Sequence, residues 1–266
     1  MKKNILAVLL VVLSFTLFAC SNENKIRVVA TEKPHAEILE FAKPLLKEKG
    51  YKLDIQLTDN YAFGNPEVEK GRADANFFQH VPFFEEKNTN GALVNVGGIH
   101  LEPIGIYGGT ITKFEELKDG DKIIISDNAP DYGRIAAIIA DLGLAETVDG
   151  FIHTNPYASP EEALKPGSKT VDFKFEVIEA ALLTTALKAK EGALFFINGN
   201  YAITGNLDIS TALFVESPEN NPYVNILVVK KGDEELPKIK ALYEVLTSQE
   251  VKDFILKTYN GTVIPA

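Results

Sequence analysis

The strongest constraint on the fold is an alternation of short apolar segments with segments of helical periodicity, which starts at residue 27 and continues to the C-terminus. Such alternation is typical of α/β layers on a mainly parallel sheet. In the first half of the chain we predict strands over 27–30, 53–57, 73–77 and 93–96, and helices over 38–46, 68–71 and 81–87. Pro44 should kink or shorten the first helix, because proline lacks a backbone donor.

A second series of the same kind follows Pro103. We predict strands over 122–126, 173–178, 193–197, 213–216 and 224–229, and helices over 135–142, 179–188, 236–246 and 249–259. Segment 150–172 is rich in Pro, Ser, Thr and Gly, and we expect no regular element there. Two α/β series predict two lobes with a cleft between them, where small ligands usually bind.

The N-terminus has the layout of a secretory signal, with Lys2 and Lys3 followed by an apolar stretch over 5–18. This stretch is too short to span a bilayer comfortably. It ends at Ala19-Cys20, and a small residue before a cysteine at this place resembles the lipobox of bacterial lipoproteins. The resemblance implies a signal peptide over 1–19, a lipidated tether over 20–26, and acylation of Cys20, for example with palmitate.

An ordinary signal peptide with an incidental cysteine is the alternative for Cys20. Because Cys20 is the only cysteine, no disulfide can form within the chain. With lipidation, we expect the protein to be anchored at the extracytoplasmic face of the cell membrane. No second apolar run approaches the length of a membrane helix, so the remainder should be a soluble body on a lipid tether.

The net charge and the length of the chain limit which partners and which domain organisation we expect. The chain has 27 basic and 37 acidic residues, and loss of Lys2 and Lys3 with the signal makes its net charge of −10 two units more negative. An acidic surface argues against nucleic-acid binding and against a polybasic membrane patch. The length that remains without 1–19 exceeds the usual size of a single core, which agrees with two lobes.

Motifs for catalysis or metal binding are weak. The sequence contains no G-x-S-x-G, H-E-x-x-H or P-loop pattern. The four histidines lie far apart and no pair has metal-ligand spacing. We therefore predict neither an enzyme nor a resident metal or cofactor.

The segment 76–83 combines two aromatic residues, an amide and an imidazole where a predicted strand meets a predicted helix. Ligands of α/β proteins often bind at such junctions. Phe78 could pack on an apolar side chain of a ligand while His80 donates a hydrogen bond. Equally, Phe78 could belong to the core and His80 could cap the helix, and the segment alone leaves both interpretations open.

Four blocks of the sequence, taken in order, resemble the methionine-binding lipoprotein family, the substrate-binding components of methionine-type ABC importers. The blocks are Asn76–His80, His100–Tyr107, Ile197–Ala202 and Pro222–Ile226. The resemblance is collinear and runs from about residue 27 to the C-terminal Val263-Ile264-Pro265-Ala266.

The resemblance implies a two-lobed periplasmic-binding-protein fold that closes on one amino acid and delivers it to a permease with its ATPase. It implies lobe one over 27–105 plus 220–266, and lobe two over 106–219. We expect a monomer whose partners are the ligand, the transporter and the membrane.

The resemblance also implies ligand-binding roles at the positions that match the family. An arginine at the start of the predicted helix, Arg134, would bind the ligand carboxylate, and Asn198 and Asn225 would contact the amino-acid head group. The other matching positions are Tyr61, Phe78 and His80. The chemistry agrees: a zwitterion needs a bidentate cation and acceptors for its ammonium, and a thioether suits an aromatic pocket.

The loop before Arg134 departs from the family pattern, which has Asn-Asp-Pro-Thr-Asn where this chain has Asp127-Asn128-Ala129-Pro130-Asp131-Tyr132. Asp131 could recruit a cationic or more polar group, or it could be solvated. We therefore predict capture of L-methionine or a close analogue, with another amino acid, D-methionine or a short methionine-containing peptide as alternatives. A surface adhesin or scaffold and an enzyme derived from the binding fold are the rival classes.

Overall fold

The computed structural model describes residues 24–266. The predicted signal peptide over 1–19 and the predicted lipidation site Cys20 lie outside the described residues. Strand β1 (Lys25–Ala30) already includes Lys25 and Ile26, so regular structure begins inside the segment predicted as a tether over 20–26. None of the helices that the structure describes is long and apolar enough to cross a membrane.

Strands and helices alternate as the sequence predicted. The remaining strands are β2 (Lys52–Leu57), β3 (Ala75–His80), β4 (Leu93–Leu101), β5 (Gly105–Gly108), β6 (Lys122–Ser126), β7 (Lys174–Ile178), β8 (Leu194–Ile197), β9 (Phe214–Val215), β10 (Val224–Lys230) and β11 (Ile264–Pro265). The α-helices are α3 (Glu37–Glu48), α4 (Tyr61–Glu69), α5 (Val81–Lys87), α6 (Tyr132–Asp141), α7 (Pro160–Ala163), α8 (Leu183–Ala189), α9 (Gly199–Thr204), α10 (Pro237–Leu246) and α11 (Gln249–Tyr259). Single turns form η1 (Glu32–Ala36), η2 (Phe114–Glu116), η3 (Ala129–Asp131), η4 (Ala180–Leu182) and η5 (Ile209–Thr211).

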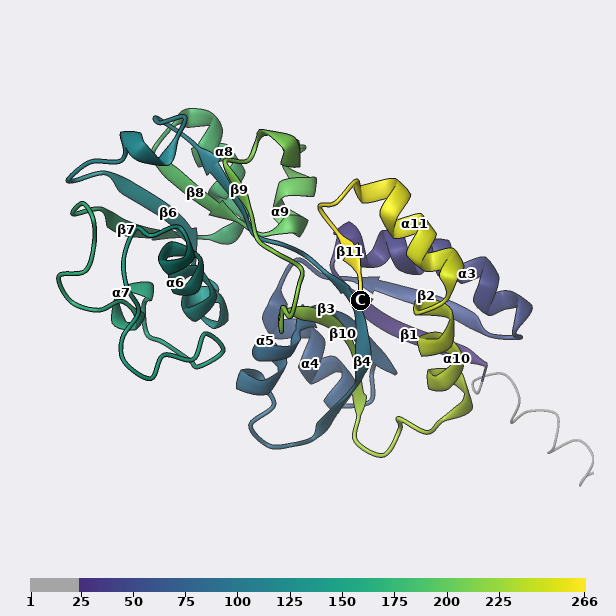
Figure 1. The fold of residues 1–266 in the computed structure, drawn as a ribbon. Coiled ribbons are helices and arrows are strands. Elements are labelled where there is room, and N and C mark those ends of the chain that lie inside the picture. The colour runs from purple at the N-terminus through teal and green to yellow at the C-terminus, as the bar shows by residue number, and fades with distance from the viewer. Residues whose placement is uncertain (1–23) are drawn as a thin grey trace, which may run out of the picture. The chain divides into compact units, whose positions relative to one another are not determined.

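The strands form two mixed sheets in which parallel pairing is prominent (Figure 1). The six-stranded sheet has the order β11-β4-β10-β3-β1-β2, and β1 pairs in parallel with both β2 and β3. The five-stranded sheet has the order β7-β6-β8-β5-β9, and β6 pairs in parallel with β7 and β8. Strand β11 pairs antiparallel with β4, and β5 pairs antiparallel with both β8 and β9. The α/β fold class predicted from the alternation is therefore confirmed.

The chain divides into two compact units. Among the described residues, the first comprises 24–78, 90–97 and 227–254, and the second comprises 79–89, 98–226 and 255–266. The short segments 79–89 and 255–266 thus group with the second unit. The lobe boundaries expected from the resemblance, 27–105 plus 220–266 and 106–219, stay a prediction.

The core of the second unit follows from the period-two pattern of strand β6. Ile123 and Ile125 point to one face of the sheet and pack with α6, whereas Ile124 points to the other face and packs with α8. All three side chains are at most 1% exposed. Covering both faces of a strand requires an uninterrupted apolar run, which explains the Ile-Ile-Ile sequence.

In the first unit, β1 and α3 supply much of the core. Val28 and Val29 are fully buried on β1, and Ile38 and Leu39 are fully buried on α3. Helix α3 continues through Pro44 to Glu48, so the expected shortening at the proline did not occur.

Two helices begin earlier than the sequence pattern predicted. Helix α4 starts at Tyr61 rather than at residue 68, because the side chain of Asn60 accepts a 2.9 Å hydrogen bond from the Ala62 amide and caps it. Helix α6 starts at Tyr132 rather than at residue 135, directly after the turn η3. Both early starts place predicted ligand-binding residues, Tyr61 and Arg134, in the first turn of a helix.

Candidate binding site

Asp131 organises a buried polar cluster in the second unit. Its side chain is 0% exposed at the end of η3, where the chain enters α6. Oδ2 accepts hydrogen bonds from Nδ2 of Asn128 at 2.7 Å and from Nδ2 of Asn198 at 2.9 Å. Oδ1 lies 3.3 Å from Nε2 of His80 and 3.4 Å from Nη1 of Arg134. The suggestion that Asp131 could be solvated is therefore wrong.

These neighbours determine the charge of Asp131. Burial by itself would raise the pKa of the carboxyl group. The hydrogen bond from His80 and the positive charge of Arg134 outweigh this effect and hold the pKa well below its usual range. Asp131 is therefore a carboxylate at neutral pH.

Arg134 is only 2% exposed and is held mainly by Glu216. Its Nε lies 2.9 Å and 3.0 Å from the two carboxylate oxygens of Glu216, and Nη2 donates to Oε2 of the same residue. Nη2 also donates to the backbone carbonyl of Glu102 at 2.9 Å. Burial would lower the pKa of Arg134, but the Glu216 carboxylate raises it above its ordinary value. The guanidinium is thus a fixed cation.

The backbone positions Glu216 opposite this cation. Glu216 directly follows β9, which pairs with β5 through Val215 and Gly105. Its amide donates to the carbonyl of Ile104 at 3.0 Å, and its Oε2 accepts from the Ile104 amide at 3.1 Å. The ladder between β5 and β9 therefore fixes where the Glu216 carboxylate lies.

His80 ends β3 and caps α5. Its Nδ1 accepts a 3.1 Å hydrogen bond from the Phe83 amide. An acceptor at Nδ1 places the ring proton on Nε2, which then donates to Asp131. The helix-capping role that the sequence left open is therefore present, and the same ring also contributes a donor to the polar cluster.

Tyr223 covers the cluster with an aromatic face. Its ring centroid lies 4.3 Å from Cζ of Arg134 and 5.2 Å from the ring centroid of His80. Its hydroxyl donates to the carbonyl of His153 at 2.7 Å. Burial and the nearby Asp131 carboxylate raise the pKa of Tyr223 far above its usual value, so the phenol stays neutral. A cation on a neutral aromatic face is a favourable arrangement.

Tyr61 and Phe78 lie together in the first unit. Their ring centroids are 6.0 Å apart with an interplanar angle of 25°. Gly64 makes this arrangement possible, because a Cβ there would lie 2.2 Å from Cε1 of Phe78. The two rings lie nearly parallel, and aromatic rings of this kind interact favourably with a thioether.

Of the six predicted ligand-binding residues, the structure brings His80, Arg134 and Asn198 together around Asp131. It pairs Tyr61 with Phe78 separately, in the other unit. Asn225 is 5% exposed in β10 and makes none of the hydrogen bonds to Asp131 and Arg134 given above.

Two of the remaining members of the cluster, Asp131 and Tyr223, could have been suspected from the sequence. Asp131 stands three residues before Arg134, a spacing at which side chains meet on a helix. Tyr223 lies inside a block that carried the family resemblance. Glu216 had no local signal, because its pairing with Arg134 spans 82 residues.

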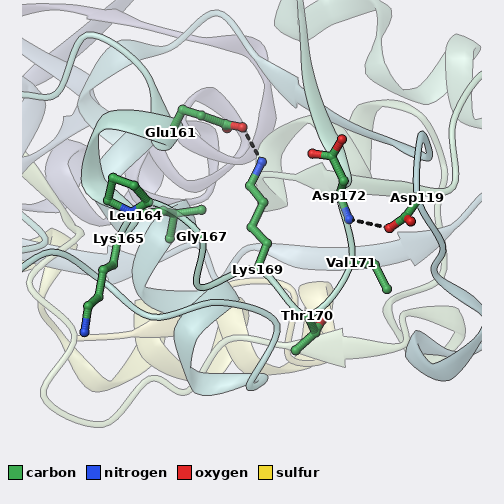
Figure 2. Close-up of a pocket in the computed structure, with 10 residues that line it drawn as sticks. Asp119, Glu161, Leu164, Lys165, Gly167, Lys169, Thr170, Val171 and Asp172 are labelled. Carbon is green, nitrogen blue, oxygen red and sulfur yellow. Dashed lines mark hydrogen bonds and ion pairs between the residues drawn. The ribbon is translucent and has the colours of Figure 1, made fainter.

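A separate surface pocket of about 530 Å³ lies on the second unit. Figure 2 shows the side chains that line it. Its walls come largely from segment 161–172, which the sequence left without an element. Lys169 forms an ion pair with Glu161 there, and its Nζ donates to the carbonyl of Phe173 at 2.8 Å. The pocket contains none of the six predicted residues, so we do not assign the ligand to it.

A fixed guanidinium, a donor imidazole and an orientated amide can bind the polar groups of a small molecule. The fold agrees with this chemistry. The chain is similar to an ABC transporter periplasmic substrate-binding protein from Coxiella burnetii, with a TM-score of 0.81, 29% identity, and coverage of 91% of this chain and 100% of the other. This similarity places the chain in the class of substrate-binding proteins.

Within this class the chain belongs to the NlpA lipoprotein family, whose profile matches residues 26–266. It is 42% identical to the methionine-binding lipoprotein MetQ of Bacillus subtilis, covering 100% of this chain and 99% of that protein. It is also 29% identical to the D-methionine-binding lipoprotein MetQ of Salmonella typhi, covering 94% of this chain and 93% of that protein. The family expected from the four sequence blocks is confirmed.

Proposed function

We propose that this protein captures methionine, or a close analogue, at the outer face of a membrane and delivers it to an ABC-type importer. The observation that carries the proposal is the end-to-end similarity, at 42% identity, to a methionine-binding lipoprotein. The similarity to a periplasmic substrate-binding protein of an ABC transporter supports the role in import.

The polar cluster supports recognition of an amino-acid head group. In our proposal Arg134 binds the carboxylate, with His80 as a second donor. Asn198 turns Nδ2 toward Asp131, which leaves its Oδ1 as an acceptor for the ammonium group. Asn225 contributes to the same head group.

The aromatic pair supports recognition of the side chain. Tyr61 and Phe78 would contact the methionine thioether, because sulfur interacts favourably with aromatic rings. One relative is named a methionine-binding lipoprotein and another a D-methionine-binding lipoprotein. The stereochemical preference is therefore part of the test.

We further propose that lipid on Cys20 holds the protein at the membrane as a monomer, with a permease and its ATPase as partners. The small residue before Cys20 and the polar residues after it support this anchoring. At least two acyl chains are needed for stable attachment.

The test is native mass spectrometry of the soluble body, from Ser21 onward, before and after denaturation. We expect a released mass equal to that of methionine, and a higher melting temperature when methionine is added back to the stripped protein. Separate titrations with L- and D-methionine then determine the preferred form.

Other outcomes separate the alternatives. Release of a different amino acid or a short peptide would keep the transport role and change the substrate. Conversion of the ligand during incubation would favour an enzyme. An empty protein whose melting temperature does not respond to amino acids or short peptides would favour an adhesin or scaffold and contradict the proposal.

A further inference from the structure

The cation of the polar cluster is outnumbered by carboxylates. Arg134 contacts both Asp131 and Glu216, and both are at most 12% exposed as side chains. The phenol of Tyr223 is neutral, because burial raises its pKa. Two carboxylates therefore face one guanidinium, which leaves an excess of one negative charge around Arg134.

Other charged groups nearby do not change this count. The backbone carbonyl of Glu102 contacts Arg134, but its carboxylate points elsewhere. Oε1 of Glu102 lies 2.9 Å from Nε2 of His100, and Oε2 accepts from the Asn200 amide at 3.0 Å. The charges that face the Arg134 guanidinium are those of Asp131 and Glu216.

Most of the donors of Arg134 are already used. Nε and Nη2 bind Glu216 and the Glu102 carbonyl, and one hydrogen of Nη1 faces Asp131. Within residues 24–266 the second hydrogen of Nη1 has no acceptor. A ligand carboxylate that reaches this hydrogen therefore approaches Arg134 next to two protein carboxylates, those of Asp131 and Glu216.

We infer that Glu216 is a specificity-determining residue: its carboxylate makes the cluster net negative, so that a ligand must bring its own ammonium group beside its carboxylate. A zwitterion adds no net charge, whereas an anion with the same side chain adds a second negative charge to a buried site. This inference rests on the proposed function, because it assumes that the head group binds at Arg134.

Glu216 is better suited to this role than Asp131. The two oxygens of Asp131 contact Asn128, Asn198 and His80 and so hold these three side chains in place. Replacing Asp131 would therefore disturb more than the charge. Within residues 24–266, the Glu216 carboxylate makes hydrogen bonds with Arg134 and the Ile104 amide alone. Replacing Glu216 by Gln keeps an acceptor for Nη2 of Arg134 and removes the charge.

The experiment uses the full chain, processed by its host and purified in detergent, and measures binding of three probes by calorimetry. L-Methionine carries both charges, its 2-hydroxy acid analogue lacks the ammonium, and L-methioninamide lacks the carboxylate. In the parent protein we expect the hydroxy acid to bind at least about 100-fold more weakly than methionine, from Coulomb energies between partly buried charges.

The Glu216→Gln variant should shift the two analogues in opposite directions. Relative to methionine, the hydroxy acid should bind about tenfold more tightly and the amide about tenfold more weakly, because one negative charge is removed. Glu216→Asp keeps the charge and should keep the parent's order of affinities. Glu219→Gln removes an exposed carboxylate three residues away and serves as the matched control.

Loss of structure would weaken all three probes by a similar factor, so opposite shifts distinguish a charge effect from damage. A common shift, or unchanged ratios, in a folded Glu216→Gln variant overturns the inference while methionine binding upholds the proposed function. If the variant does not fold, the affinities of the parent protein for methionine and for the hydroxy acid are compared. Equal affinities would also overturn the inference. A parent that binds none of the probes overturns both.

Discussion

Nδ2 of Asn198 donates a 2.9 Å hydrogen bond to Oδ2 of Asp131, although 67 residues separate them in the sequence. The bond connects the N-terminus of α9 to the turn before α6. It orients the Asn198 amide, because a carboxylate only accepts, so Nδ2 must face Asp131. A residue that the sequence marked as a departure from its family thus positions a predicted ligand-binding amide.

Replacement of Asp131 should destabilise the protein. In the Asp131→Asn variant the buried Arg134 and His80 lose a charged acceptor, and we expect a loss of roughly 3–5 kcal/mol in the free energy of unfolding. Asp141→Asn, an exposed carboxylate at the end of the same helix, should change it by less than about 0.5 kcal/mol. Urea denaturation at pH 7 measures both, and equal effects would contradict the structural role of Asp131.

The same carboxylate predicts how stability depends on pH. Because folding lowers the pKa of Asp131 below its ordinary value of 3.8, its contribution is fully present at neutral pH and is lost only as the pH falls below that value. The difference in unfolding free energy between the parent and Asp131→Asn should therefore be constant from pH 7 to about pH 5 and shrink in stronger acid. A difference that already disappears by pH 5 would count against the lowered pKa.

Removal of Arg134 should weaken ligand binding strongly. We expect Arg134→Ala to reduce methionine affinity by at least about 2–3 kcal/mol, because charge-assisted hydrogen bonds to the carboxylate are lost. The matched control is Arg72→Ala, since the Arg72 side chain is 53% exposed and pairs with Glu67. Calorimetry on variants that melt cooperatively checks the prediction. Parent-like affinity in Arg134→Ala would remove Arg134 from the site.

A methyl group at Gly64 should disturb the aromatic pair. The added Cβ would lie 2.2 Å from Phe78, which is 5% exposed and has little room to move. We expect Gly64→Ala to lower stability by about 1–3 kcal/mol, despite a gain in helix propensity, and to weaken methionine binding. Trimming the ring in Gly64→Ala/Phe78→Leu should recover part of the stability, as thermal melts can measure. An unperturbed single variant would contradict the close packing.

Anchoring depends on Cys20 in our proposal. A Cys20→Ala variant cannot be acylated, so we expect the protein to leave the membrane fraction of the producing cells. Fractionation followed by immunoblotting measures this, with Ser21→Ala as the neighbouring control. Membrane association that persists in Cys20→Ala would favour an ordinary signal peptide with an incidental cysteine.

Sequence periodicity predicted the bounds of an element best where its apolar pattern was uninterrupted. The helix over 81–87 and the strand over 122–126 have the predicted bounds. One error arose where a side-chain cap fixes the helix start, as at Asn60, which begins α4 at Tyr61 although Gly64 and Pro66 interrupt the helical pattern of the sequence. Strand β5, rich in glycine and flanked by short loops, was not predicted because its pairing with β8 and β9 comes from distant segments.

The sequence by itself determined the α/β class, through the alternation of apolar patterns, and the family, through four ordered blocks. Through the family resemblance it also pointed to His80, Arg134 and Asn198 as candidate ligand-binding residues. Only the tertiary structure decided that Asp131 is a buried carboxylate in contact with these three residues, and that Glu216 occupies one edge of the Arg134 guanidinium. The physical reason is that local patterns report periodicity and propensity, whereas burial and pairing of charges depend on residues brought together from distant parts of the chain.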